Sequence, residues 1–281
     1  IRDRHSDIPI TGSHTMTSDR CILLEIKDHV ATVTLNRPQV MNALNWQAYS
    51  ELEQAFRDLQ RDPEVRCIIV TGNGRAFCSG DDVREIMLKT GSNENGSNRL
   101  KEVRPGTTPA ARAILDCDRP IIAAVNGAAV GWGMDLSLMA DFRIASDQAK
   151  FGELFVKRGL VADVGGMLRL PKIVGPEKAA ELLFTGDIFT AAYAKEIGMV
   201  MQVVPDKDLL TAANDLASRI TCNPPLAVRN LKEGLRRSFH GDYEEMGNWI
   251  SKTLGELFQT EDHKEGVASF LEKREPTFRG R

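Results

Sequence analysis

The hydrophobic runs along the chain are short, and they alternate with helical patterns. Two β-rich runs flank a polar turn at residues 21–35, which predicts a β-hairpin. Leu44, Leu52, Phe56 and Leu59 then recur at helical spacing and predict an amphipathic helix. Further strands are predicted in VRCIIVTG (65–72), RPIIAAVNG (119–127), DFRIAS (141–146) and MVMQVV (199–204), and a further helix in PAARAILDC (109–117). Strand, turn and helix in repeated order predict an α/β protein with mostly parallel strands.

The chain divides by pattern into a core and a helical tail. Residues 16–205 carry the alternating pattern, whereas 206–281 carry only helical patterns, with a break at the Asn-Pro-Pro of 223–225. The last helix is amphipathic, and its apolar face needs a partner in this subunit or the next. Residues 91–108 are polar and rich in Gly, Ser and Asn, which predicts a mobile loop. Residues 1–15 show no periodicity and resemble the remnant of an expression tag.

Composition narrows the classes of protein. With 281 residues, 42% of them hydrophobic, the chain is long enough to bury a sizeable core. A net charge of −3 without a basic stripe argues against a nucleic-acid partner. No apolar run approaches the roughly 20 residues of a membrane span, and no signal peptide is recognisable. The five cysteines are scattered, which favours a reducing cytoplasm over a disulfide framework or a zinc site.

Two segments share one design that bears on chemistry. TGNGRAFCSGDD (71–82) and VNGAAVGWGMD (125–135) each run from a predicted strand through a glycine turn into a helix. Such turns leave backbone N–H groups without partners, and the helix dipole adds positive potential there. Two facing turns would hold a carbonyl oxygen that becomes an oxyanion. Each turn alone could equally be an ordinary strand-to-helix connection. Phe77 interrupts the dinucleotide-binding glycine pattern.

Longer motifs carry a family resemblance. They are TLNRPQVMNAL (34–44), IIVTGNGRAFCSGDD (68–82), RPIIAAVNGAAVGWGMDL (119–136), KFGELFVKRGLVADVGGMLRLPKIVG (150–175) and IGMVMQVVP (197–205). In this order they resemble the enoyl-CoA hydratase/isomerase, or crotonase, family over residues 20–280. The resemblance implies a spiral of β-β-α units, a C-terminal helical trimerisation region and an acyl-CoA thioester as substrate. It also implies a homotrimer or a dimer of trimers.

The same resemblance assigns backbone and acidic groups. The two oxyanion N–H groups fall on Asp81 and Trp132. The Trp132 indole either shapes the acyl pocket or packs in the core. Hydratases of the family use two glutamates, and Asp135 stands at the first of these positions. Phe155 stands at the second and cannot transfer a proton, so the usual two-carboxylate water addition cannot run.

Another acid follows in GLVADVGG. Family members that shift dienoyl-CoA double bonds carry an Asp at the position of Asp163, as does a dehalogenating branch. Asp163 is therefore the leading acid/base candidate beside Asp135, although an Asp here could also be a helix N-cap. Beside an apolar pocket, either carboxyl would have a raised pKa, which suits acid/base catalysis. Glu153 lies in the FGEL turn near the site and faces either the site or solvent, while Asp82 is expected to brace its loop.

Remaining positions concern the pocket and the coenzyme. Phe155 and Met134 are expected to shape the acyl pocket together with the loop at 91–108. By motif position, the residues expected to contact CoA are Arg37, Ala76, Phe270 and Lys273, the last two across subunits. Lys273 could instead be an ordinary surface lysine.

The functional expectation is an acyl-CoA enzyme that stabilises an enolate oxyanion. Double-bond isomerisation fits the acids better than hydration. A CoA-ester hydrolase or a C–C-cleaving branch is an alternative, because Asp163 could act on water or as a nucleophile. A catalytically silent acyl-CoA-binding module is another, motivated by Phe155. No cofactor is expected beyond the CoA of the substrate, and neither a metal site nor a Ser-His-Asp triad is recognisable.

Overall fold

The computed structural model describes residues 20–88 and 107–281. The predicted hairpin is present, since β1 (Ile22–Lys27) and β2 (Val30–Leu35) pair antiparallel in the register Ile22↔Leu35. Four more strands join β2 in parallel to complete a six-stranded sheet of order β1-β2-β3-β5-β7-β10. They are β3 (Cys67–Gly72), β5 (Ile121–Val125), β7 (Phe142–Ser146) and β10 (Gln202–Val204). The prediction of mostly parallel strands is confirmed.

A second, smaller sheet lies where only glycine turns were expected. Its four strands, in the order β4-β6-β8-β9, are β4 (Ala76–Cys78), β6 (Ala128–Val130), β8 (Lys150–Gly152) and β9 (Phe189–Thr190). Three of them directly follow a strand of the larger sheet, so that β3-β4, β5-β6 and β7-β8 are successive pairs, each followed by a helical turn or helix. Close backbone approach between the sheets requires glycine, because a Cβ on Gly127 would lie 2.2 Å from the carbonyl oxygen of Arg75.

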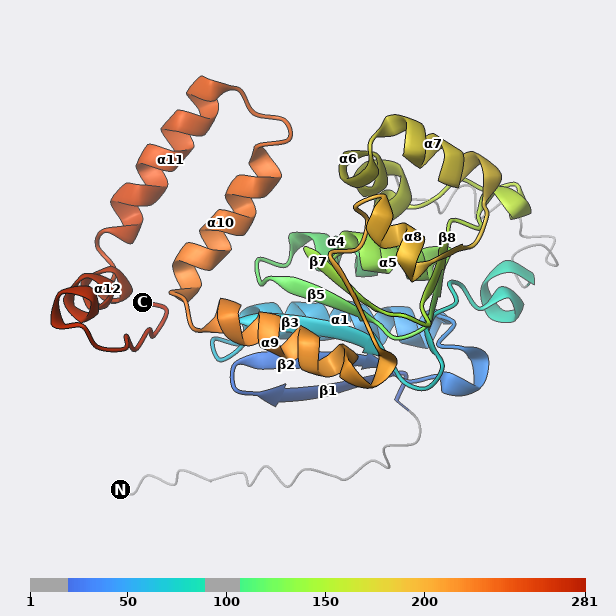
Figure 1. Ribbon diagram of the computed structural model, residues 1–281, viewed down its shortest axis with the longest axis horizontal. Coiled ribbons are helices and arrows are strands. Elements are labelled where there is room, and N and C mark those ends of the chain that lie inside the picture. Colours follow the sequence, from blue (N-terminus) through green and yellow to red (C-terminus); the bar gives the residue numbers. More distant parts are fainter. Residues whose placement is uncertain (1–19, 89–106) are drawn as a thin grey trace, which may run out of the picture.

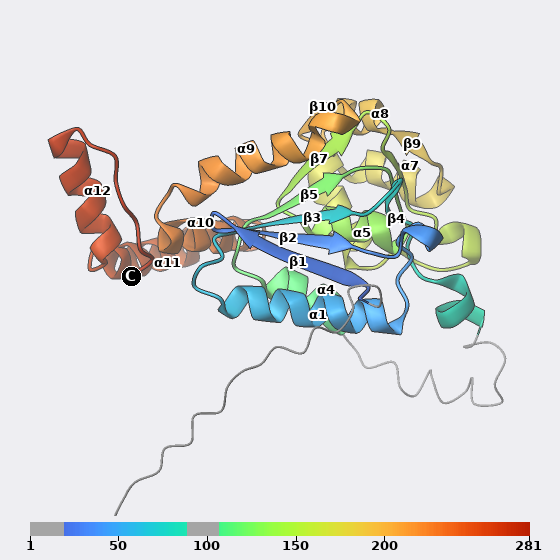
Figure 2. The ribbon, with the colours of Figure 1, turned by 90° about the horizontal axis from the view of Figure 1, so that it is seen from below.

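Helices cover both faces of the larger sheet. Figure 2 shows α9 (Leu209–Thr221) on one side of it, with α1 (Trp46–Arg61) and α4 (Pro109–Asp116) on the other. α1 is amphipathic as predicted, and the Asn45 side chain caps it by accepting the N–H of Ala48. The alanines and Leu209 of α9 pack against strand residues such as Ile69, Ile122 and Ile144. Residues 206–281 were predicted as a separate helical region, but α9, its first long helix, packs on the sheet of the core.

The remaining helices form a cap and a C-terminal region. The cap comprises α6 (Leu170–Val174), α7 (Pro176–Thr185) and α8 (Ala191–Glu196). Short helical turns are η1 (Pro38–Val40), η2 (Val83–Leu88), η3 (Val156–Arg158), η4 (Gly165–Arg169) and η5 (Asp206–Asp208). After the Asn-Pro-Pro break, α10 (Pro225–Arg237), α11 (Tyr243–Leu257) and α12 (Glu261–Glu272) extend away from the sheets (Figure 1). Within the described residues, no helix is both long and apolar enough to cross a membrane.

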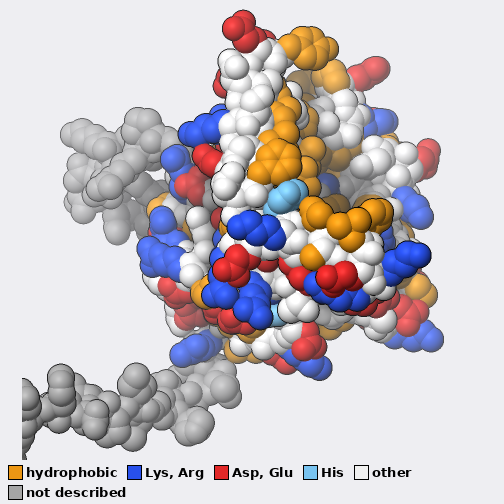
Figure 3. Space-filling view, turned by 90° about the vertical axis from the view of Figure 1, so that its left-hand side faces the viewer, with side chains coloured by type: hydrophobic (Ala, Val, Ile, Leu, Met, Phe, Trp, Pro, Cys, Tyr) orange, Lys and Arg blue, Asp and Glu red, His pale blue; other side chains and the backbone are white. Residues whose placement is uncertain are grey.

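The C-terminal helices present apolar side chains to solvent. Figure 3 shows a stripe of hydrophobic side chains on this end of the molecule. The exposed apolar residues of these helices are Leu231, Leu235, Ile250, Leu254, Val267, Phe270 and Leu271. The last helix therefore finds no cover for Phe270 and Leu271 within the described part of this chain.

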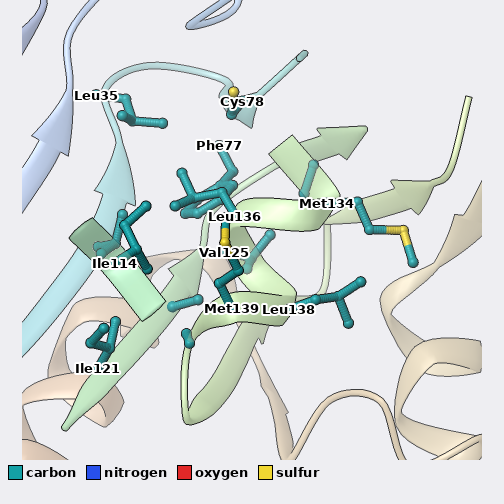
Figure 4. Packing of buried hydrophobic residues seen from close by; sticks show 14 of the residues in the cluster. Leu35, Phe77, Cys78, Ile114, Ile121, Val125, Met134, Leu136, Leu138 and Met139 are labelled. Carbon is teal, nitrogen blue, oxygen red and sulfur yellow. The ribbon is translucent and has the colours of Figure 1, made fainter. Parts of the chain in front are cut away.

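One helix lies at the centre of the core. α5 (Trp132–Met139) is buried at all eight positions, and Asp135 is its only charged residue. Figure 4 shows that the Met134 side chain of α5 lies in the same cluster as Phe77 of β4 and Ile114 of α4. A helix that is apolar on every side is typical of a buried position between layers. The lone carboxylate of α5 is consequently placed in the interior.

Candidate active site

The two glycine turns meet in space although they are about fifty residues apart in sequence. Gly80 has a φ of +88°, and a Cβ built there would lie 3.3 Å from the backbone nitrogen of Trp132. Gly131 has a φ of +54° and starts α5, whose second residue, Gly133, touches the carbonyl of Cys78. A side chain would strain the backbone at Gly80 and Gly131, where φ is positive, and would collide with the Cys78 carbonyl at Gly133. The segments carrying Asp81 and Trp132 are thereby brought side by side.

Between the turns lies a narrow slot. It has a volume of about 40 Å³, and Gly80, Asp81, Gly131 and Trp132 are among its lining residues. Trp132 is the first residue of α5, so its N–H has no acceptor within the helix and lies at the positive end of the helix dipole. A polarised oxygen placed in this slot would face that N–H.

The slot adjoins a larger apolar pocket. This pocket has a volume of about 740 Å³ and shares Asp81, Trp132 and Phe155 with the slot. Its other walls come from α1, from the start of α4 and from the segment that precedes η4, with Tyr49, Ala110, Val161 and Asp163 among them. Its size is in the range of small-molecule sites, and its acids are few. The arrangement can hold an apolar acyl group with its carbonyl in the slot.

Aromatic and acidic side chains form a chain of contacts along the pocket wall. The Tyr49 hydroxyl donates to Asp81 Oδ1 at 2.5 Å, and the Tyr49 ring meets the Trp132 ring edge-on with centroids 4.9 Å apart. The Trp132 indole N–H in turn donates to Asp163 Oδ2 at 3.0 Å. Burial raises the pKa of Tyr49 well above its ordinary value, and the charge of Asp81 adds to this, so its hydroxyl keeps its proton. The indole is thus both buried and part of the pocket wall.

Three acids line the pocket: Glu53, which pairs with Arg57, Asp81, which accepts the Tyr49 hydroxyl, and Asp163. The Oδ1 of Asp163 accepts the N–H of Val164 at 2.7 Å and its Oδ2 accepts the indole of Trp132. The turn η4 takes Val164 as its N-cap and receives no capping side-chain bond there. Asp163 also stands directly before the helical run that begins at Val164, since its carbonyl accepts the N–H of Met167. A capping role alone does not account for the bond from its Oδ2 to the Trp132 indole.

Asp135 lies behind Asp163 instead of on the pocket wall. It is fully buried, and its carboxylate accepts the N–H of Asp163 at 3.2 Å and the N–H of Gly166. Burial raises its pKa to about 7, opposed by these N–H groups and assisted by the charge of Asp163. The raised pKa of Asp135 was expected. Its position was not, because Asp135 lies behind the pocket wall and not on it, where a catalytic acid would touch the substrate.

Glu153 is buried too, so of its two expected orientations the one towards solvent is wrong. It is 1% exposed, and neither carboxyl oxygen has a hydrogen-bond partner among residues 20–88 and 107–281. Its Oε1 lies 3.0 Å from where a Cβ on Gly166 would be, while a Cβ on Gly165 would collide with Asp135. The two glycines therefore let η4 lie directly against both carboxyl groups. Burial raises the pKa of Glu153 well above its ordinary value, and the charges of Asp135 and Asp163 add to the effect.

Other predicted residues divide between pocket and scaffold. Phe155 lines both pocket and slot, as expected. Met134 does not line them, because it is fully buried in the core beneath the turn. This corrects the expectation for Met134: its side chain leaves α5 on the core side.

The residues predicted to touch CoA lie outside the pocket. Arg37 donates to the carbonyl of Ala43 at 2.5 Å and to Asp82 at 3.1 Å, so it braces the loop together with Asp82. Ala76 is buried in β4. Phe270 is 83% exposed on α12, and Lys273 ends that helix in a left-handed conformation. Within this chain, neither Phe270 nor Lys273 lines the pocket.

Tyr49 is a site residue that the sequence reading missed. It lies one turn from Leu52 and next to Ala48, on the buried face of the predicted helix. Its spacing from Leu52 and Phe56 was available in the sequence, but a tyrosine at that spacing also fits a plain core position.

Comparison with known proteins identifies relatives across almost the whole chain. The family model described as enoyl-CoA hydratase/isomerase matches residues 25–281. A crotonyl-CoA hydratase from Syntrophomonas wolfei is 36% identical over 258 residues, covering 92% of this chain and 97% of that protein. A short-chain-enoyl-CoA hydratase from Clostridium acetobutylicum is 34% identical over 256 residues, covering 90% and 95%.

Solved structures give the same result. A crystal structure of enoyl-CoA hydratase from Mycobacterium tuberculosis H37Rv aligns with a TM-score of 0.84 at 35% identity, covering 94% of this chain and 100% of that one. An enoyl-CoA hydratase structure from Bacillus anthracis aligns with a TM-score of 0.85 at 32% identity, covering 93% and 100%. The predicted crotonase-type fold is confirmed. The chain belongs to the enoyl-CoA hydratase/isomerase family of enzymes.

Proposed function

We propose that this protein isomerises the double bond of an enoyl-CoA. In this proposal the N–H groups of Asp81 and Trp132 hold the thioester oxygen in the slot. Asp163 takes a proton from one carbon of the acyl group and returns it to another, through an enolate whose negative charge lies on the slot oxygen. The stronger binding of that oxygen as its charge grows is what lowers the barrier.

One observation carries the choice of isomerisation. Asp135 and Glu153 are buried behind the pocket, whereas the partly exposed Asp163 lines it. Water addition in the two-carboxylate manner needs a second proton-transferring group across from the first, and Phe155 occupies that wall. A proton shift within one substrate molecule needs a single carboxylate that acts first as base and then as acid.

Hydration is the second candidate, because two of the relatives are named as hydratases of crotonyl-CoA and of short-chain enoyl-CoA. Spectroscopy of the thioester separates the two reactions. Incubation with a 3-enoyl-CoA is expected to raise the absorbance of the conjugated thioester, whereas crotonyl-CoA with water is expected to show no loss. Loss of crotonyl-CoA absorbance at a comparable rate would instead establish hydration.

Asp163→Asn tests the assigned base. It is expected to reduce kcat by about 100-fold or more, because general acid–base catalysis contributes on this order. Asp215→Asn, at an exposed position of α9, is the matched control and should leave kcat unchanged. An Asp163→Asn enzyme with full activity would refute the assignment. Binding of acyl-CoA without turnover of either ester would favour a silent binding module.

The proposed assembly is a homotrimer or a dimer of trimers. The exposed apolar side chains of α10–α12, among them Phe270 and Leu271, support it because burying them would stabilise an oligomer. In such an assembly Phe270 and Lys273 would be available to the CoA of a neighbouring subunit. Sedimentation of the purified protein measures its mass, and a monomer at micromolar concentration would refute this proposal.

A further inference from the structure

The Trp132 side chain has contacts that its backbone role does not require. Any residue supplies a backbone N–H, yet this position carries an indole that is 3% exposed. The indole N–H donates to Asp163 Oδ2 at 3.0 Å, while the N–H of Val164 occupies Oδ1. Each carboxylate oxygen of Asp163 is thus engaged by one donor and retains a lone pair for a substrate proton.

Neighbouring groups hold the indole in place. The Tyr49 ring meets it edge-on at an interplanar angle of 84°, and the Tyr49 hydroxyl is itself fixed by Asp81. Its backbone is fixed at the start of α5, where a Cβ on Gly80 would lie 3.3 Å from the Trp132 nitrogen. The ring therefore has little freedom to turn away from Asp163.

The surroundings of Asp163 explain why an indole suits this task. Three titratable groups that interact electrostatically with Asp163 are all acids: Tyr49 of α1, Asp135 of α5 and Glu153 beyond β8. A hydrogen-bond donor beside these acids holds the Asp163 carboxylate in one orientation. The indole suits this task, because its N–H only donates.

We propose that the Trp132 indole is a positioning group that fixes the Asp163 carboxylate relative to the oxyanion slot. This rests on the proposed function, in which Asp163 moves the proton. In this proposal the backbone N–H of Trp132 faces the thioester oxygen, and its indole holds the Asp163 carboxylate. Trp132 therefore fixes the distance between the oxyanion slot and the base.

Trp132→Phe tests the role, since it keeps the backbone N–H and most of the ring but removes the indole donor. Loss of a hydrogen bond to a charged group is expected to lower kcat by roughly 10- to 100-fold. KM is expected to change less than about two-fold, because the thioester contacts are retained. Trp249→Phe on α11, remote from the pocket, is the matched control and should leave both constants unchanged.

A spectroscopic test is independent of turnover. The chain has three tryptophans, so an ¹H–¹⁵N spectrum should show three indole signals, and the one lost in Trp132→Phe belongs to Trp132. Asp163→Asn is expected to shift this signal and to leave that of Trp249 in place.

The outcomes separate the two proposals. Trp132→Phe with unchanged kcat, or with a raised KM alone, would overturn the positioning role in an active enzyme. The positioning role would also be overturned if Asp163→Asn left the Trp132 indole signal at its wild-type position. Wild-type protein without turnover of any enoyl-CoA would refute the proposed function, whereas the shifted signal would still show that the indole holds Asp163.

Discussion

Glu153→Gln should make this protein more stable at neutral pH. Glu153 is 1% exposed, and both its oxygens lack partners, so its carboxyl is expected to stay protonated in the folded chain. Burial raises its pKa well above the ordinary value. At a pH between the two pKa values, the folded protein keeps a proton that the unfolded chain has released. The free energy of unfolding is therefore highest below the pKa of the unfolded chain, and it falls as the pH rises towards the pKa of the folded protein. Glutamine keeps the shape and removes the charge that would have to be buried.

The size of the effect follows from this linkage. Each such carboxyl costs about 1.4 kcal/mol of unfolding free energy per pH unit within its window. For Glu153 the window opens near its unfolded pKa of about 4.3 and extends to its raised pKa. Between pH 5 and pH 7, wild type should therefore lose stability through Glu153, and Glu153→Gln should not. Asp135, with a pKa of about 7, adds a similar slope to both proteins.

Urea unfolding at pH 5, 6, 7 and 8 measures the difference. The two proteins should be nearly equal at pH 5 and diverge steadily above it, with the variant more stable. Glu196→Gln at an exposed position of α8 is the matched control and should follow wild type. Parallel curves for wild type and Glu153→Gln would refute the reasoning, because they would mean that Glu153 takes up no proton on folding.

Three further substitutions have expected outcomes. Gly133→Ala should destabilise the fold by about 2 kcal/mol or more in urea unfolding, because its Cβ would lie 2.0 Å from the carbonyl of Cys78. Lys232→Met should cost about 3 kcal/mol in urea unfolding, because it removes the buried ammonium 2.6 Å from the Asp141 carboxylate and leaves the N–H of Ile121 to stabilise that charge. An unchanged free energy of unfolding would contradict this. Phe155→Glu adds a carboxylate to the pocket wall and should produce loss of crotonyl-CoA absorbance; a variant as inert as wild type would show that this position is not what prevents hydration.

Part of the site was visible in the sequence because its signals are local. Glycine turns after predicted strands marked the segments of Asp81 and Trp132, whereas Asp163 was assigned through the family resemblance of GLVADVGG. The burial of Glu153 and of Met134 was not visible. From the sequence, the side chains of Glu153 and Met134 could point either towards the pocket or away from it. Packing against η4 decides this for Glu153, and packing against β4 decides it for Met134.

The sequence by itself determined the hairpin, the parallel strands, the amphipathic α1 and the helical C-terminus. These elements depend on the spacing of hydrophobic residues and on the residues that form turns, and both can be recognised within a short segment of sequence. Tertiary structure decided the second sheet, whose strands of two or three residues are too short to show a period. It also decided that the Gly80 and Trp132 segments lie side by side and that the indole donates to Asp163. Contacts between residues thirty to fifty positions apart depend on how the layers pack, and no local pattern records them.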